Sequence, residues 1–307
     1  MNSSPQLLLP DEYLVHAIDS INRARRRVSL LVMVMADDNK TLSLVDALCA
    51  AAQRGIMVNV AVDIFTYAEI GGHLRFHTKR NKHVQPATRL EQRLRDAGVD
   101  FRWLGTNGSS IFSGRTHSKW LVADDIVYAF GGINLFQRGL EHTDFMLELQ
   151  DATLAGRLAQ EQARIVQADK NDRVYRSHQF ETTAGTVLVD GGLTGESIIY
   201  RRICELAKKA SRVTYVSQYC PTGRLGRILS RTDSRLYFNP WNRADSFNAM
   251  VIRVGSAMSG HESIYARKNY LHAKLMILEL KTGHKVAVCG SHNFSHGGVW
   301  LGTRNRS

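Results

Sequence analysis

The sequence has no hydrophobic run long enough to span a bilayer. Its longest apolar stretch, Val28–Ala36, is interrupted by Ser29 and is far shorter than the roughly 20 residues that a membrane-crossing helix needs. The first ten residues lack the basic start and the long apolar core of a secretory signal. These absences predict a cytoplasmic protein. If such a protein acts on lipid, we expect it to do so peripherally, from the membrane surface.

Cysteine is scarce, and its spacing is irregular. The four cysteines lie in apolar surroundings and form no C-x-x-C pair. We therefore expect free thiols in a reducing compartment. Neither cysteine nor histidine spacing indicates a metal site, and no cofactor is expected. The four residues are Cys49, Cys204, Cys220 and Cys289.

Acidic residues are too few to balance the basic ones. The chain has 28 Asp and Glu against 40 Lys and Arg, which gives a net charge of +12. Such an excess favours anionic partners, namely phosphodiester substrates, acidic lipid surfaces or nucleic acid. A basic surface that serves only solubility is the simpler alternative.

With 307 residues, the chain can form one large core or two modules of about 150 residues each.

One pattern of residues occurs twice. Both copies read His-x-Lys, four residues, an acid, a short apolar segment and then Gly-small-x-Asn. A single His-x-Lys is more often a core feature, but two sets in the same order predict an internal duplication. The second copy is four residues longer, which a hairpin turn at 281–284 accounts for. The first copy comprises His117, Lys119, Asp124, Gly131 and Asn134, and the second comprises His272, Lys274, Glu279, Gly290 and Asn293.

The spacing within each copy predicts a cluster of polar groups. Ser118–Ala123 and Ala273–Leu278 are apolar and bounded by polar residues, as buried strands are. Side chains two apart on a strand share a face, so each histidine lies beside its lysine. The small residues after the next strand allow close approach of the backbone and bring the asparagine near the histidine. One imidazole, one cation and one amide together suit a tetrahedral oxyanion such as phosphate.

The doubled pattern resembles the signature of the phospholipase D superfamily, H-x-K-x4-D followed by G-[GS]-x-N. The first copy matches at every position, whereas the second has Glu279 in place of Asp. His142-Thr143-Asp144 before the apolar segment Phe145–Leu149 is similar to the cardiolipin-synthase-like phosphatidyltransferase branch. The resemblance implies an α/β fold of two tandem, pseudo-two-fold-related α-β-α sandwich halves with the active site between them. We expect the halves to be residues 1–170 and 171–307.

The resemblance also implies a role for each motif residue. His117 would attack phosphorus to form a phosphohistidine, and His272 would act as the general acid and base. Asp144 is the better candidate to orient an imidazole, whereas Asp124 and Glu279 would hold the strand turns. No metal is needed where lysines neutralise the phosphate. The residues that would hold the nonbridging oxygens are Lys119, Lys274, Asn134 and Asn293.

The second half departs from the family pattern at its end. The family usually has an acid about eleven or twelve positions after the second asparagine, but Arg304 and Asn305 stand there. That acid normally orients a catalytic histidine, so its loss would weaken one of the two imidazoles. The strand that should follow it is also missing, which would expose a sheet edge.

These observations predict an enzyme that cleaves anionic phospholipid at the membrane surface. The acceptor would be a glycerol-type alcohol or water, and we expect a monomer because both motifs lie in one chain. A superfamily nuclease acting on nucleic acid is the main alternative. A catalytically degenerate phosphate-binding protein is the second alternative, because of the short C-terminus.

The rest of the chain alternates helical and strand-like patterns. Helices are predicted over Glu12–Arg26 and Leu42–Arg54, and strands over Val28–Met35 and Ile56–Ile64. This β-α-β rhythm implies a largely parallel sheet. The remaining predictions are a basic excursion that could form a lid at Thr66–Thr88, a Gly/Ser-rich loop at Gly105–Gly114 and a linker at Ala168–Arg176.

Overall fold

The computed structural model describes residues 4–71, 84–106, 116–191, 195, 197–244 and 246–294. Most of the predicted lid at Thr66–Thr88 and of the loop at Gly105–Gly114 lies outside these residues. Arg304 and Asn305 also lie outside them, so the predicted loss of the second acid is a statement about sequence alone.

The first half is built on a seven-stranded sheet in the order β1-β7-β6-β5-β2-β3-β4. The β2–β3 and β3–β4 pairs are parallel and the other pairs are antiparallel. The expectation of a largely parallel sheet was therefore wrong for this half, because tight turns return the motif strands as antiparallel hairpins. The strands are β1 (Gln6–Leu8), β2 (Arg27–Val32), β3 (Met57–Asp63), β4 (Asp100–Leu104), β5 (Trp120–Ala123), β6 (Ile126–Ala129) and β7 (Met146–Gln150).

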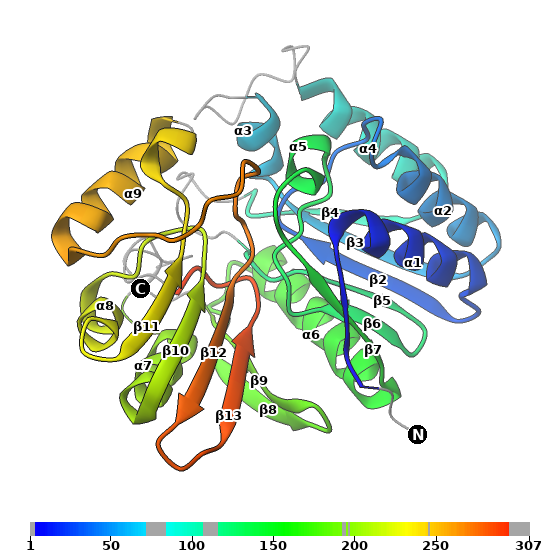
Figure 1. Ribbon diagram of the computed structural model, residues 1–307. Helices are drawn as coiled ribbons and strands as arrows, with labels where there is room; N and C mark the ends of the chain where they lie inside the picture. The colour runs from blue at the N-terminus through cyan, green and yellow to red at the C-terminus, as the bar shows by residue number, and fades with distance from the viewer. Residues whose placement is uncertain are drawn as a thin grey trace.

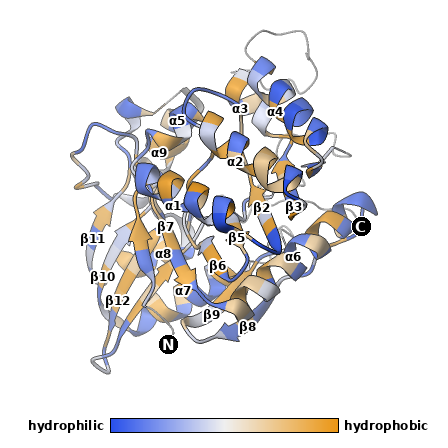
Figure 2. Ribbon diagram, turned by 90° about the vertical axis from the view of Figure 1, so that its right-hand side faces the viewer, coloured by the Kyte–Doolittle hydropathy of each residue, from blue (hydrophilic) through white to orange (hydrophobic). Residues whose placement is uncertain are grey.

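Helices cover both faces of this sheet. Alternate residues of β2 point to opposite faces: Leu30 packs among the residues of α1, α2 and α4, whereas Leu31 packs with Leu154 and Leu158 of α6. Figure 2 shows α1 and α2 in front of the strands of this sheet. The helices are α1 (Pro10–Arg23), α2 (Leu42–Gln53), α3 (Thr66–Gly71), α4 (Gln85–Asp96), α5 (Gln137–Leu140) and α6 (Ala152–Lys170).

The second half repeats part of this plan. Its four-stranded sheet has the order β11-β10-β12-β13, with β10–β11 parallel and the other pairs antiparallel. This order and these directions match those of β3-β2-β5-β6 in the first half. The elements are α7 (Ile198–Lys209), β10 (Ala210–Val216), α8 (Gly223–Leu229), β11 (Asp233–Tyr237), α9 (Ser246–Ser259), β12 (Leu275–Leu280) and β13 (Lys285–Cys289), with a 3-10 turn at Trp241–Arg243.

A two-stranded hairpin lies between the halves in sequence. Its strands, β8 (His178–Thr182) and β9 (Gly185–Val189), pair only with each other among the described strands. The predicted linker at Ala168–Arg176 begins inside α6, which continues to Lys170. The division into domains at residue 170 stays a prediction.

The two sheets stand side by side, and two loops join them (Figure 1). The amides of His272 and Ala273 donate to the carbonyl of Thr143 at 2.9 and 3.0 Å, and Thr143 N donates to Tyr270 O at 2.8 Å. The hydroxyl of Tyr265 donates to Thr143 Oγ1 at 2.9 Å. The segment that precedes β7 in the first half is therefore tied directly to the segment that precedes β12 in the second.

Candidate active site

The two His-x-Lys sets occupy equivalent places in the two sheets. His117 and Lys119 lie just before β5, and His272 and Lys274 lie just before β12. Both strands therefore begin two residues later than predicted. Lys119 Nζ donates to the carbonyl oxygen of His117 at 3.0 Å, and Lys274 Nζ donates in the same way to His272 O. The same local bond thus fixes each lysine beside its histidine.

Both lysines are buried, and burial perturbs their charge. Burial lowers the pKa of Lys119 to about 8, although the carboxylates of Asp144 and Asp63 act in the opposite direction. Burial lowers the pKa of Lys274 to about 7; Asp144 opposes this shift, and the charge of Lys119 adds to it. An anion between these ammonium groups would raise both pKa values, so the site is built to bind one.

His272 of the second half is held by a carboxylate of the first half. Its Nδ1 lies 2.7 Å from Asp144 Oδ2, and their side chains are 14% and 0% exposed. Asp144 also accepts from the amide of Phe145 at 2.9 Å. Burial alone would raise the pKa of Asp144, but the bonds to His272 and Phe145 and the charge of Lys274 lower it. Asp144 is therefore ionised and fixes the tautomer of His272, leaving its Nε2 directed away from the carboxylate.

His117 is less constrained. It is exposed at the surface of the site, and within the described part of the chain no hydrogen bond holds its ring. Desolvation by the surrounding protein, followed by the charges of Lys119 and Lys274, lowers the pKa of His117 well below its ordinary value. The interaction of His117 with Lys274, His272 and His292 brings groups from both halves into one site.

His272 has a lowered pKa as well. Burial and the charge of Lys274 lower the pKa of His272 to about 4, against the opposing effect of Asp144. Both imidazoles are therefore neutral in the free site at pH 7. A neutral imidazole can attack phosphorus, and a phosphodiester anion would raise the pKa of its neighbour.

The asparagines of the two copies share an unusual feature. Asn134 Oδ1 and Asn293 Oδ1 are both buried and without a hydrogen-bond partner. Buried amide oxygens are rarely left unpaired, because an unmade hydrogen bond costs about 1–3 kcal/mol. Two such atoms in equivalent positions indicate groups whose partner is a ligand.

The glycine pair of the first copy explains how the halves approach each other. A Cβ on Gly131 would overlap the carbonyl group of Phe145 at the start of β7. A Cβ on Gly132 would lie 2.7 Å from Asp144 Oδ2 and 3.1 Å from His272 O. Only glycine allows this backbone to pass so close to the Asp144–His272 pair.

The other two acids of the motifs lie away from the histidines. Asp124, in the turn between β5 and β6, accepts from the amides of Arg25, Arg26 and Arg27 at 2.8, 2.9 and 3.0 Å. Burial would raise the pKa of Asp124, but these amides outweigh it and lower it. Glu279 lies near the far end of β12, 3.7 Å from both Arg212 and Lys285. Both acids thus hold the ends of the motif strands and do not contact the motif histidines.

Sequence reasoning missed three residues of this site. The ring of His142 lies 5.6 Å from that of His272. The pKa of His142 is lowered to about 3, chiefly by burial and then by the charges of His272, Arg138 and Lys274. The charge of Asp144 opposes this shift. His292 influences His117, and Asp63, at the end of β3, accepts from Thr116 N at 2.7 Å. Two signals in the sequence could have indicated these residues. Asp63 is an acid at the end of an apolar strand, and His142 and His292 each lie close to one of the motifs.

Among the described residues, no three His, Cys, Asp or Glu side chains are grouped as metal ligands.

A comparison with protein families identifies the first half. Residues 17–166 match the family described as "Cardiolipin synthase, PLD-like domain". The first half of the chain therefore belongs to a phospholipase D-like family. This match supports a protein that handles phosphodiesters, and the second half repeats the strand order of the first. No curated protein matches the sequence.

Solved structures agree on the fold. The phosphatidylserine synthase of Haemophilus influenzae is 12% identical, aligned over 91% of this chain and 77% of that one, with a TM-score of 0.64. The polyphosphate kinase of Porphyromonas gingivalis is 14% identical, aligned over 92% of this chain and 44% of that one, with a TM-score of 0.54. At these identities the likeness concerns the fold alone. No helix among the described residues is long and apolar enough to cross a membrane.

Proposed function

We propose that the protein is a phospholipase D-type enzyme that cleaves the phosphodiester of an anionic phospholipid. It transfers the phosphatidyl group to a glycerol-type alcohol or to water. The observation that carries this proposal is the meeting of both His-x-Lys sets in one site, with His272 fixed by Asp144 from the other half.

In the first step, a ring nitrogen of His117 attacks phosphorus. The bond from phosphorus to the leaving alcohol breaks, and that oxygen takes a proton from His272. The product is a phosphohistidine on His117 and a neutral His272. Because substrate binding brings a negative charge beside His272, the pKa of this residue rises from about 4 toward the range in which it can carry that proton.

The second step reverses the first with a new alcohol. His272 takes the proton from the acceptor hydroxyl, whose oxygen attacks phosphorus while the bond from phosphorus to His117 breaks. Lys119, Lys274 and the two motif asparagines stabilise the negative charge that the nonbridging oxygens carry in both transition states. The two steps together leave no net change on the protein.

A lipid substrate is favoured by the description of the matched family together with the net charge of +12. The same charge would also suit nucleic acid. The test therefore offers both substrates to one preparation. Mixed micelles containing phosphatidylglycerol are assayed for released glycerol and for cardiolipin, and single-stranded DNA is assayed for cleavage, each with wild type and His117→Ala.

We expect lipid turnover that is lost in His117→Ala, with DNA left intact. DNA cleavage that depends on His117, without lipid turnover, would make the protein a nuclease. No turnover of either substrate, with retained phosphate binding, would make it a phosphate-binding protein and contradict the proposal.

A further inference from the structure

Helix α9 (Ser246–Ser259) has hydrophobic residues on two opposite faces. Its inner face packs on the second half, where Ile252 is 1% exposed and belongs to the core. A Cβ on Gly255 would lie 3.3 Å from Thr222 and 3.5 Å from Cys220. A helix with one face on the core normally presents a polar outer face to water.

The outer face of α9 is apolar instead. Met250, Val254 and Met258 are 63%, 49% and 80% exposed, and their spacing of four residues aligns them in a single stripe. The helix contains no acidic residue, and its one charged residue is Arg253. We call Met250, Val254 and Met258 the α9 stripe. Three neighbouring exposed hydrophobic residues on one helix indicate a contact surface rather than scattered surface residues.

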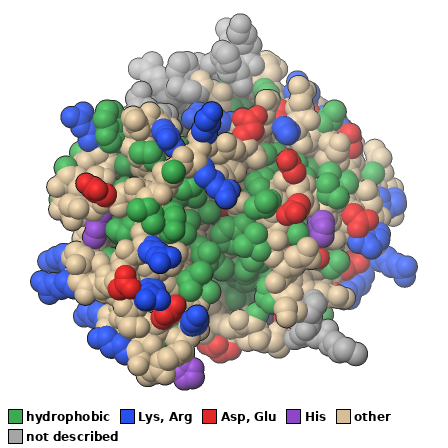
Figure 3. Space-filling view, in the orientation of Figure 1, with side chains coloured by type: hydrophobic (Ala, Val, Ile, Leu, Met, Phe, Trp, Pro, Cys, Tyr) green, Lys and Arg blue, Asp and Glu red, His purple; other side chains and the backbone are tan. Residues whose placement is uncertain are grey.

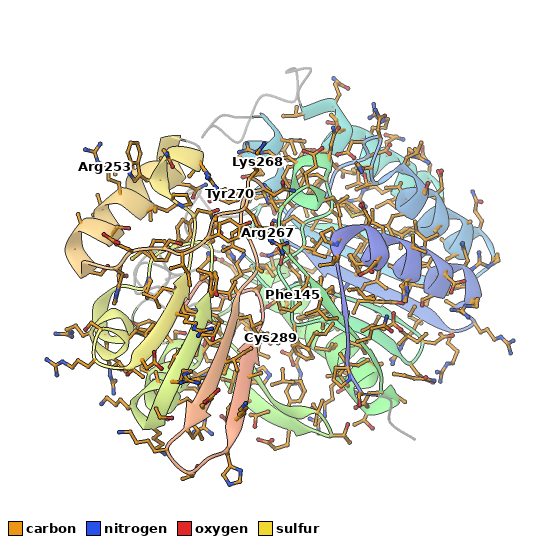
Figure 4. The ribbon with its side chains drawn as sticks, in the orientation of Figure 1. Phe145, Arg253, Arg267, Lys268, Tyr270 and Cys289 are labelled. Carbon is orange, nitrogen blue, oxygen red and sulfur yellow. The ribbon has the colours of Figure 1, made fainter. Side chains whose placement is uncertain are left out.

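Trp241 and Arg253 adjoin this stripe, and further basic residues follow in the same segment of the chain. The guanidinium of Arg253 lies 5.4 Å from the centroid of the Trp241 ring, and Trp241 is 52% exposed. The segment from 241 to 270 has four basic residues, Arg243, Arg253, Arg267 and Lys268, and two acidic ones. Figure 4 shows Arg253 on the outside of α9, and Arg267 and Lys268 on the loop that leads down to Tyr270. In Figure 3, hydrophobic and basic side chains occur together over the position of α9.

A chain of polar contacts joins α9 to the catalytic histidines. The hydroxyl of Tyr219 donates to Asn248 Oδ1 on α9, and Gln218 Nε2 donates to the hydroxyls of Tyr219 and Tyr270 at 3.0 and 3.1 Å. The Tyr270 ring lies 5.1 Å from that of His142, which in turn neighbours His272. These contacts therefore connect α9 to the loop that carries Tyr270, next to His142 and His272.

We propose that the α9 stripe docks the protein on the surface of an anionic phospholipid bilayer. The inference rests on the proposed function and extends it by naming where the enzyme meets its substrate. Exposed methionine and valine side chains, an interfacial tryptophan and a fringe of arginine and lysine are the features of a helix that lies in the plane of a membrane interface. Apolar residues enter the acyl boundary, and the basic residues contact the phosphates.

The test measures partition of the purified protein onto sonicated vesicles of phosphatidylglycerol and phosphatidylcholine. One variant carries Met250→Gln, Val254→Thr and Met258→Gln, which keep side-chain length and shape. A matched control carries Met57→Gln and Val15→Thr, at residues that are 65% and 66% exposed elsewhere on the molecule. Melting temperatures check folding, since exposed substitutions change stability by about 0.5 kcal/mol or less.

We expect the triple variant to lose about 100-fold in vesicle affinity, because three apolar side chains no longer enter the interface. The control should bind as wild type does. Arg253→Gln should lose about fivefold on phosphatidylglycerol vesicles and nothing on pure phosphatidylcholine, since one basic residue contributes about 1 kcal/mol at an anionic surface. A phosphatidylglycerol with chains short enough to stay monomeric should be turned over equally by wild type and the triple variant.

Unchanged vesicle binding by the folded triple variant would overturn the docking proposal. A second result would also overturn it: wild type is a dimer, the triple variant is a monomer, and the two bind vesicles equally. The stripe would then be the contact between two copies of the chain. Loss of vesicle binding without any phospholipid turnover by wild type would leave docking standing and remove the proposed function. If wild type turns over monomeric lipid and the triple variant still binds vesicles as wild type does, the proposed function stands and the docking proposal falls.

Discussion

The two halves of the molecule share a strand order but differ in how far each sheet extends. Four strands in the order β6-β5-β2-β3 have counterparts in β13-β12-β10-β11. The first sheet continues with β7 and β1 on one edge and with β4 on the other. In the described part of the second half, β13 is an edge strand that pairs with β12 alone. The exposed sheet edge predicted from the sequence depends on residues after 294, which lie outside the described part of the chain, so it stays a prediction.

The carboxylate just before β7 sets the chemistry of the site. Asp144 immediately precedes the part of the first half that forms β7, and it holds His272 of the second half. The second half supplies no equivalent carboxylate to His117 from its described residues. We infer that the two imidazoles are not equivalent: the fixed one transfers protons, and the exposed one attacks phosphorus.

The largest expected effect comes from removing each imidazole in turn. His117→Ala should lower kcat by a factor of at least about 10⁴, because no nucleophile remains. His272→Asn should lower it by about 10² to 10⁴, the usual contribution of a general acid and base. Steady-state kinetics on micellar phosphatidylglycerol measure both. A larger loss in His272→Asn than in His117→Ala would reverse the roles assigned to the two halves.

Asp144→Asn tests the link between the halves. It keeps the shape of the side chain but removes the charge that fixes His272, so we expect kcat to fall by about 10² to 10³. Weakening a buried hydrogen bond to a charged group also costs about 1.5–3 kcal/mol of folding free energy, which denaturant unfolding measures. The matched control is Asp124→Asn, which replaces one of the two oxygens that accept from the amides of Arg25, Arg26 and Arg27, away from the histidines, and should spare kcat in the folded protein. Equal losses of kcat in the two variants would mean that Asp144 only supports the fold.

The motif glycines show the same asymmetry in stability. Gly131→Ala would drive a Cβ into the carbonyl of Phe145, and we expect it to destabilise the fold by about 2–4 kcal/mol. Gly290→Ala in the second copy meets no atom within 4 Å, although its φ of +155° is unfavourable for alanine. A cost of about 1–2 kcal/mol is expected there. Denaturant unfolding compares the two, and a larger cost at Gly290 would show that the second copy is packed as closely as the first.

The pH dependence of kcat/KM should be a bell whose limbs come from different groups. Lys274 and Lys119 are charged below pKa values of about 7 and 8, so phosphate binding should weaken as the pH rises through these values. His117 attacks phosphorus only while its ring is neutral, and its pKa lies well below the ordinary histidine value, so activity should fall only at a pH well below that of an ordinary histidine. Each limb should approach a tenfold change per pH unit. An alkaline limb that begins only near pH 10 would mean that the lysines are not buried as described.

The repeated parts of the fold were predictable because their signals are local. Apolar segments next to each motif predicted β5, β6, β12 and β13, and the turn at 281–284 joins β12 to β13 as expected. Helices α1 and α2 begin within two residues of the predicted starts. These elements have strong periodicity or clear end signals in their own sequence.

The unpredicted parts depend on contacts between distant segments. β1 is only three residues long and exists through pairing with β7. The hairpin of β8 and β9 is too exposed to show a regular apolar pattern. His142 became part of the site only because the loop that carries it bonds to residues 269–273. No pattern in one half predicts which residues of the other half it will meet.

The most direct test of the account is to trap the covalent intermediate. The His272→Asn variant, mixed with phosphatidylglycerol and quenched, should accumulate a phosphatidyl group that peptide mass spectrometry locates on His117. A modification on any other residue, or a folded variant that forms none while wild type turns lipid over, would contradict a mechanism in which the exposed imidazole of the first half attacks phosphorus.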